Sequence, residues 1–138
     1  AAGFAVVACD DRPGTLTPDW VPGVYDRRLV DYKNLSELCP IGPRDLVVVA
    51  TAGHKSDIDV VIQAMRAKPA YLGCLGSRRK TAFVRARLKQ EGFTQDQIDG
   101  LHLPIGVAIE AEDPEEIAIS IAAEMIHLRR TKLIPRKR

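Results

Sequence analysis

The chain has 138 residues, of which 46% are hydrophobic and 28% are charged, a composition typical of one soluble globular domain. The formal net charge of +2 is unevenly distributed, because residues 129–138 hold six cations and no acid, whereas the rest hold 14 cations and 18 acids. This distribution argues against nucleic-acid binding, and no apolar run reaches the ~18 residues of a membrane-spanning helix. We expect one domain over residues 1–130 and a basic tail over residues 131–138.

The three cysteines are widely spaced and include no C-x-x-C pair, so neither a zinc site nor a disulfide framework is predicted. Cys9 and Cys74 lie inside apolar runs, where an unpaired cysteine is expected to be buried and inert. Cys39 precedes Pro40 in a predicted loop and is expected to be more exposed. This use of cysteine favours a reducing compartment, and therefore a cytoplasmic protein.

The first part of the chain is expected to contain strands. Short, unbroken apolar runs at residues 4–9 and 46–50 predict strands that are buried on both faces, as in a parallel sheet. A weaker strand is expected around residues 24–25 or 29–30, and a brief helical turn at residues 35–38.

Helices and one further strand are expected from residue 51 to residue 92. The spacing of apolar residues predicts a helix over residues 57–66, with Ser56 as its cap. The unbroken apolar run at residues 70–75 predicts a third strand that is buried on both faces. A second helix is expected over residues 80–91, ending at Gly92. Its inward-facing side chains are predicted to be Phe83, Val84, Ala86 and Leu88.

The last helix has the clearest start signal. Asp113 is placed to be its N-cap, with Pro114 in the first helical position and Glu116 completing a capping box. Residues 117–128 are apolar almost all round. Such a helix is either wedged between layers or half-buried in a subunit interface, and we expect it to form a homodimer.

The order of these elements predicts an α/β fold: a Rossmann-like, doubly wound, mainly parallel sheet with helices on both faces. A dinucleotide fold opens with a strand, a G-x-G-x-x-G loop and a helix, and an acid follows about 20 residues after the glycines. Here Gly3 is the only glycine before Asp10, so we expect the first βα unit to be absent from this chain.

Three loops are candidate sites, because ligands in open α/β sheets bind beyond the carboxyl ends of the strands. In the first, Asp10 and Asp11 follow a buried strand, at the position that accepts hydrogen bonds from a nucleotide ribose, and Arg12 adds a cation. The alternative is that the two acids only form the turn before Pro13.

The second loop contains Thr51, Gly53 and His54. Gly53 would permit close approach of a ligand, and His54 could donate or accept a proton near it. The alternative is a loop histidine that only hydrogen-bonds the backbone. No arrangement typical of nucleophilic catalysis, of nucleotide hydrolysis or of metal binding is found, so no catalytic or metal-ligating residue is predicted.

The third loop is the most informative stretch of the sequence. A glycine and a capping serine end a buried strand, and three cations follow in the first helical turn: Gly76, Ser77, Arg78, Arg79 and Lys80. Cations are unfavourable at the positive end of a helix, and a bound anion would reverse that effect. The alternative is that the long side chains turn away and are screened by solvent.

Several of these motifs occur together in one known family. They are residues 71–80 (YLGCLGSRRK), 103–106 (LPIG) and 114–118 (PEEIA), together with the turn at residues 10–13 (DDRP) and the loop at residues 51–57. In this combination and order, the chain from residue 4 to residue 129 resembles the C-terminal domain of the xanthine dehydrogenase accessory family (XdhC/CoxI type).

The resemblance implies a Rossmann-like domain of a maturation factor for molybdenum hydroxylases. Members of that family are thought to bind molybdenum cofactor (molybdopterin), to support its sulfuration and to deliver it to the apoenzyme. The implied partners are an apo-hydroxylase of the xanthine dehydrogenase type and a sulfurtransferase.

The leading hypothesis is therefore an accessory protein that handles an anionic cofactor, rather than an enzyme with its own turnover. One alternative is an NAD-dependent oxidoreductase domain, with NAD or NADP in the cleft, which Asp10 at its strand end would favour. The other alternative is a nucleotide-sensing regulatory module.

Overall fold

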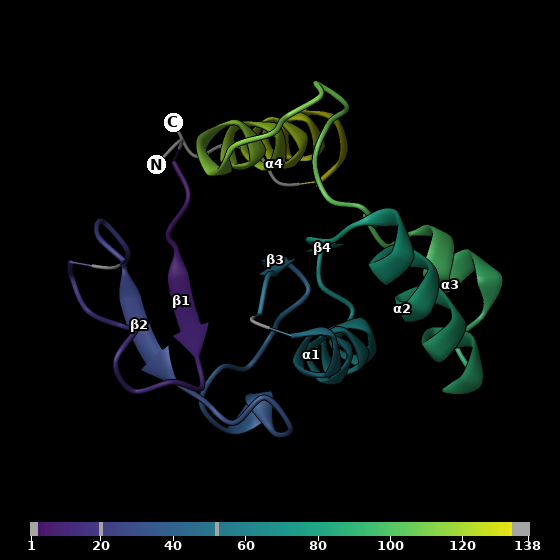
Figure 1. Ribbon diagram of the computed structural model, residues 1–138, viewed down its shortest axis with the longest axis horizontal. Helices are drawn as coiled ribbons and strands as arrows, with labels where there is room; N and C mark the ends of the chain where they lie inside the picture. Colours follow the sequence, from purple (N-terminus) through teal and green to yellow (C-terminus); the bar gives the residue numbers. More distant parts are fainter. Residues whose placement is uncertain (1–2, 20, 52, 134–138) are drawn as a thin grey trace.

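Four short strands form two parallel pairs in the computed structural model, which describes residues 3–19, 21–51 and 53–133. Strand β1 (Val7–Asp10) pairs with β2 (Asp26–Leu29), and β3 (Leu46–Val49) pairs with β4 (Tyr71–Cys74). Figure 1 shows the first pair beside the second, with β1 on the side nearer to β3. The predicted α/β class with parallel strands is confirmed, whereas the sheet is divided.

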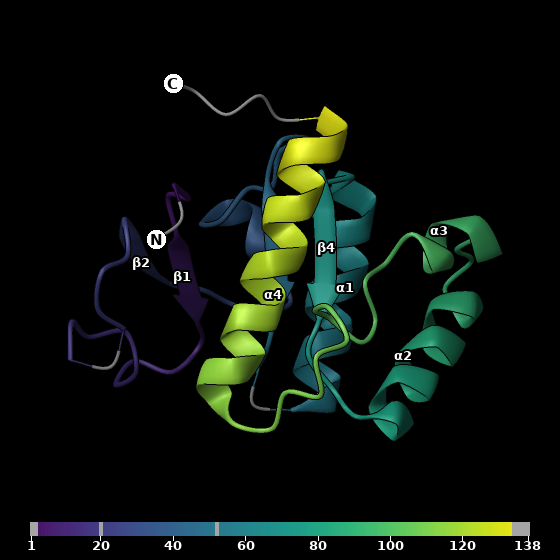
Figure 2. The ribbon, with the colours of Figure 1, turned by 90° about the horizontal axis from the view of Figure 1, so that it is seen from above.

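Helices cover both faces of the β3–β4 pair, as expected for a doubly wound fold. Figures 1 and 2 place α1 on one face of this pair and α4 on the other, with α2 and α3 to one side. The bounds are η1 (Leu35–Glu37), α1 (His54–Ala67), α2 (Arg78–Gln90), α3 (Gln95–Asp99), α4 (Pro114–Leu128) and η2 (Arg129–Leu133). Among the described residues, no helix is long and apolar enough to cross a membrane.

The core lies between β3–β4 and the helices α1, α2 and α3. All four residues of β4 are buried, and α1 contributes the fully buried Val61 and Ala64. Val84 and Leu88 of α2 are also fully buried. Each such side chain contributes on the order of 1–3 kcal/mol relative to an exposed one.

Burial on both faces was predicted for three strands, and it is found for β4 alone. Val7 of β1 is 37% exposed and Val48 of β3 is 42% exposed. In a two-stranded sheet both strands are edge strands. The side chains of each strand therefore have a neighbouring strand on one side only. Strand β4 differs because Gly73 also forms a parallel bridge with His102, which gives this strand a neighbour on each side.

The helix boundaries follow the capping signals, with one correction. Helix α1 begins at His54 with Gly53 as its N-cap, so the prediction that Ser56 caps it is wrong. The Ser77 side chain caps α2, and Gly92 follows the end of that helix with a φ of +94°. The capping box at Asp113 is confirmed, since Asp113 and Glu116 each accept from the other's backbone N–H.

One other expectation for the helices is wrong, and one short helix was not expected. Phe83 is 53% exposed and Ala86 is exposed, so the buried face of α2 is narrower than predicted. The short helix α3 was not expected, although the capping box of Thr94 and Gln97 marks its start. The chain remains helical through η2, where the predicted tail begins, and residues 134–138 lie outside the described residues.

Candidate functional site

Two of the three candidate loops are joined by one buried carboxylate, that of Asp57. Its Oδ1 accepts hydrogen bonds from the Thr51 backbone N–H at 2.8 Å and from the Thr51 hydroxyl at 2.7 Å. Its Oδ2 contacts the ammonium group of Lys80. Asp57 is fully buried and the Lys80 side chain is only 12% exposed. A buried ion pair with this many hydrogen bonds fixes the end of β3 against the start of α2.

Lys80 therefore differs from the other cations of its loop. Its side chain lies against Gly76, where an added Cβ would stand 2.5 Å from the Lys80 Cδ. Gly76 is thus needed for the lysine to reach Asp57. Arg78 and Arg79 are exposed, and the first turn of α2 contains no acid. The structure leaves these two guanidinium groups in solvent beside the positive end of the helix.

The Ser77 side chain caps this end of α2 by accepting from the Lys80 N–H at 3.3 Å. The other N–H groups of a first helical turn have no partner within the helix. The arrangement can therefore offer backbone donors and two guanidinium groups to one anion.

In the first candidate loop, Arg12 binds the Asp10 carboxylate. Arg12 donates to Asp10 through Nε at 3.0 Å, through Nη2 at 2.9 Å and through its backbone N–H at 2.9 Å. These bonds hold the pKa of Asp10 at about 2, so the carboxylate is ionised at neutral pH. Asp11 is exposed. The hydrogen bonds of the Asp10 carboxylate with Arg12 stay within this turn, whereas the contacts of Thr51 and Lys80 join the other two loops.

Gly53 and His54 lie at the start of α1. Gly53 is exposed and extended, with φ −154° and ψ 155°, and an added Cβ would meet nothing within 4 Å. Its predicted role in close approach of a ligand thus stays a prediction. His54 is the first helical residue, and its side chain lies outside the described residues.

A second polar cluster was not predicted from the sequence. It consists of Tyr71, His102 and Glu124, from β4, the loop after α3 and α4. Glu124 Oε1 accepts from the Tyr71 hydroxyl at 2.6 Å and from the Gly106 backbone N–H at 3.1 Å. The same oxygen lies 3.2 Å from His102 Nδ1, and the tyrosine and histidine rings stack with centroids 4.5 Å apart.

The chemistry of this cluster follows from its burial. Tyr71 is only 2% exposed, and burial together with the Glu124 carboxylate raises its pKa, so the hydroxyl stays protonated as a donor. The only sequence signal was Glu124, a carboxylate in an otherwise apolar helix face. Its partner could not be identified, because Tyr71 lies inside an apolar run 53 residues earlier.

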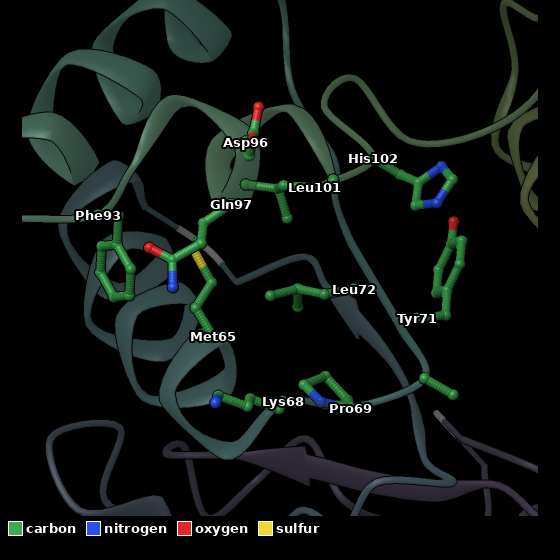
Figure 3. A pocket seen from close by; sticks show the side chains of 12 residues that line it. Met65, Lys68, Pro69, Tyr71, Leu72, Phe93, Asp96, Gln97, Leu101 and His102 are labelled. Carbon is green, nitrogen blue, oxygen red and sulfur yellow. The ribbon is translucent and has the colours of Figure 1, made fainter.

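Tyr71 and His102 line a cavity of about 290 Å³ between the end of α1, α3 and the amino end of β4. Figure 3 shows their rings facing each other on one side of it, with Met65 and Phe93 across the opening. This cavity opens at the end of β4 away from Ser77, so it is separate from the predicted loops.

The comparisons with known proteins agree with the fold and the motifs. The sequence model of the XdhC Rossmann domain family matches residues 1–125. A probable xanthine dehydrogenase subunit of Bacillus subtilis is 32% identical over 93% of this chain and 37% of its own length. The molybdenum cofactor insertion chaperone PaoD of Escherichia coli is 28% identical over 76% of this chain and 33% of its own length.

A solved structure is similar over almost the whole chain. The crystal structure of a xanthine dehydrogenase from Bacillus halodurans superposes with a TM-score of 0.80 and 30% identity, covering 95% of this chain and 37% of that one. The chain thus spans about a third of the length of these three proteins. A family match over 125 residues, on a Rossmann-like arrangement of parallel strands and helices, shows that the chain belongs to the XdhC Rossmann domain family.

Proposed function

We propose that this chain is a cofactor-handling domain of an accessory factor for a molybdenum hydroxylase of the xanthine dehydrogenase type. It binds molybdenum cofactor, or another anionic nucleotide-like ligand, and assists its insertion into the apoenzyme. The names of two relatives, a molybdenum cofactor insertion chaperone and a probable xanthine dehydrogenase subunit, support this role. The proposal includes a cytoplasmic location, a homodimer and a sulfurtransferase partner.

The observation that carries the proposal is the start of α2. Arg78 and Arg79 are both exposed there without a neighbouring acid in the first turn. Each cation at a helix N-terminus is unfavourable by a few tenths to about 1 kcal/mol when no anion is present. A phosphate group on the ligand would accept hydrogen bonds from both guanidinium groups and from the free backbone N–H groups.

The Thr51–Asp57–Lys80 contacts give this anion site a rigid base. Lys80 is neutralised by Asp57, so it holds the loop in place and the two exposed arginines bind the ligand. Thr51 ties the end of β3 to the same carboxylate. Because the base is fixed before the ligand arrives, the entropy lost on binding comes from the two arginine side chains and not from the backbone of the loop.

The alternative of an NAD-dependent oxidoreductase rests on Asp10 as the acceptor for a ribose hydroxyl. Both oxygens of that carboxylate already accept from Arg12. A ribose would have to compete with a bidentate, charge-assisted pair, so this alternative has less support than the anion site on α2.

The test is a titration of the protein with molybdenum cofactor, followed by calorimetry or by absorbance. We expect Arg78→Ala/Arg79→Ala to weaken binding at least tenfold, since a hydrogen bond to a charged group contributes about 1.5–3 kcal/mol. The matched control is Arg87→Ala/Lys89→Ala, which removes two cations from the last turn of the same helix and should change affinity little. Equal affinity of the two double variants would sink the proposed site.

A second measurement separates binding from delivery. Protein loaded with the cofactor is mixed with an apo-hydroxylase, and the recovered activity of the hydroxylase is followed. We expect recovery with the control variant, and slower recovery with Arg78→Ala/Arg79→Ala. Binding without any recovery would contradict the insertion role and leave the anion site standing.

A further inference from the structure

Two cysteines that lie 30 residues apart in the sequence are neighbours in the structure. The Cys9 thiol donates to Cys39 Sγ at 3.1 Å, and both residues are half-buried. No disulfide was predicted from the spacing of the three cysteines, and the sequence indicated that Cys9 would be inert. In the structure, Cys39 is a partner for Cys9 that the sequence spacing did not indicate.

Three separate contacts hold the two thiols together. Arg28 of β2 lies directly opposite Cys9 of β1 in the parallel register. Its Nη1 donates to the Leu38 carbonyl at 3.2 Å, which anchors the residue before Cys39. The Cys39 backbone N–H donates to the Leu35 carbonyl at 2.7 Å at the end of η1. The pair is therefore part of the local fold and does not depend on one flexible side chain.

The two thiols differ in their acidity. The hydrogen bond from Cys9 and, to a smaller extent, the positive charge of Arg28 lower the pKa of Cys39 to about 7, although its partial burial and Asp45 act in the opposite direction. The same hydrogen bond, burial and the negative charge of the Cys39 thiolate raise the pKa of Cys9. At neutral pH a large share of Cys39 is thus thiolate, which is the nucleophilic form, and Cys9 remains a thiol beside it.

Small molecules can reach Cys39, because it lines a cavity of about 190 Å³ beside Gln63 and Arg66 of α1. Cys74 provides a contrast within the same chain. It is fully buried, and burial raises its pKa to about 11. Only Cys39 combines a neighbouring thiol, a lining position in a cavity and a lowered pKa.

We propose that Cys9 and Cys39 form a redox-active dithiol that closes to an intramolecular disulfide when it meets a small disulfide such as oxidised glutathione. The Cys39 thiolate attacks one sulfur of the small disulfide, forms a mixed disulfide and releases one thiolate. Cys9 then loses its proton to solvent and attacks Cys39 Sγ, which expels the second thiolate. Two electrons pass from the two cysteines to the small disulfide, which leaves as two thiols.

The reaction takes place next to a candidate loop, since Cys9 directly precedes Asp10. The new bond would tie β1 to the segment after η1 and close a loop of about 30 residues. It requires no cofactor, so it is independent of the proposed cofactor-handling role.

The test incubates the full, folded chain in buffers of graded oxidised and reduced glutathione. We expect the free thiols to fall from three to one, the intact mass to drop by two hydrogens, and peptide mapping to join Cys9 to Cys39. Cys74→Ser is the matched control and should lose both remaining thiols in the same buffers. Three free thiols in the oxidised buffer, or a disulfide that contains Cys74, would overturn the proposal.

Single variants test the order of the two steps. In Cys9→Ser, Cys39 should stop at the mixed disulfide and gain the mass of one glutathione, whereas in Cys39→Ser, Cys9 should react at least tenfold more slowly. Circular dichroism verifies that each variant is folded. Equal rates of mixed-disulfide formation in the two folded variants would show that Cys39 is not the nucleophile and would refute the mechanism.

Discussion

Asp57 illustrates how a single side chain can couple two segments that were predicted separately as binding loops. It has no exposed surface, and its three polar contacts come from Thr51 and Lys80. An unpaired charge in such a place costs several kcal/mol, whereas the paired charge is offset by its partner and its hydrogen bonds. The lysine is therefore a structural element of the loop, and in the proposed anion site the two exposed arginines would bind the ligand.

Replacement of Lys80 by methionine tests this assignment. Lys80→Met keeps the apolar stem but leaves the Asp57 carboxylate without its counter-charge, and we expect a loss of about 3–5 kcal/mol in the free energy of unfolding. Denaturation by urea measures the loss. The control is Lys55→Met on the exposed side of α1, which should stay within about 0.5 kcal/mol of the parent chain.

A companion variant keeps this test interpretable. Asp57→Asn/Lys80→Met removes both charges, and we expect it to recover part of the stability that Lys80→Met loses. If Lys80→Met is as mild as Lys55→Met, the ion pair does not hold the two loops together.

At the scale of elements, α4 is positioned by the turn that precedes it. Gly106 has a φ of +97°, and an added Cβ would lie 2.4 Å from the Ser120 hydroxyl oxygen. Its backbone N–H donates to Glu124 at 3.1 Å, and the Val107 N–H donates to the Ser120 carbonyl at 3.2 Å. The glycine thus lets the chain approach α4 closely enough for the helix to pack over β4.

Substitution of Gly106 should reduce the free energy of unfolding by more than backbone strain alone would. We expect Gly106→Ala to reduce the free energy of unfolding by about 2–4 kcal/mol, from the left-handed conformation together with the clash. The matched control is Gly23→Ala, which has a φ of +72° but nothing within 4 Å of the added Cβ, so only the strain of about 1–2 kcal/mol applies. Thermal and urea unfolding measure both.

A double variant separates the two contributions. Ser120→Ala removes the hydroxyl that the new methyl group would meet. The double variant Gly106→Ala/Ser120→Ala should therefore recover the stability lost to the clash, but not the stability lost to backbone strain. Equal losses for Gly106→Ala and Gly23→Ala would mean that the close approach to α4 does not matter for stability.

The elements that could be predicted are those with strong local signals. Asp113 and Ser77 marked two helix starts correctly, because a cap depends on residues three positions away. The strands were located by their apolar runs, but the exposure of Val7 and Val48 depends on which strands are neighbours. The order of strands in the sheet decides this, and short apolar runs do not indicate that order.

The candidate site shows the same division between local and distant information. Exposed arginines at the start of α2 follow from a strand end and a capping serine within one loop. The Tyr71–Glu124 bond and the Cys9–Cys39 contact join positions 53 and 30 residues apart, and no local pattern indicates either. The Asp57–Lys80 pair was likewise hidden, because its two residues belong to different helices, α1 and α2.

At the scale of the whole molecule, the two ends of the described chain meet. The Arg129 guanidinium lies 4.3 Å above the Phe4 ring, and Arg129 is buried by the fold around it, since only 9% of its surface is exposed. This cation–π contact links the β1–β2 pair to the helix that covers β4.

The same helix also presents apolar surface to solvent. Ile119 is 62% exposed, and Val107 and Ile109 in the preceding segment are 38% and 50% exposed. Exposed apolar side chains that lie close together are typical of an interaction surface. The homodimer predicted from the all-round apolar sequence of this helix would cover them, with α4 of one copy against α4 of the other.

Sedimentation velocity over a range of concentrations tests the dimer. We expect the parent chain to associate and Ile119→Glu to shift the equilibrium to monomer by at least tenfold, because burying an unpaired carboxylate in an apolar interface is unfavourable. Because Ile119 is largely exposed, its replacement leaves the core intact. Leu38→Glu is the control, because Leu38 at the end of η1 is an apolar residue of similar exposure, 54%. A parent chain that stays monomeric, or two variants that associate equally, would contradict an interface through α4.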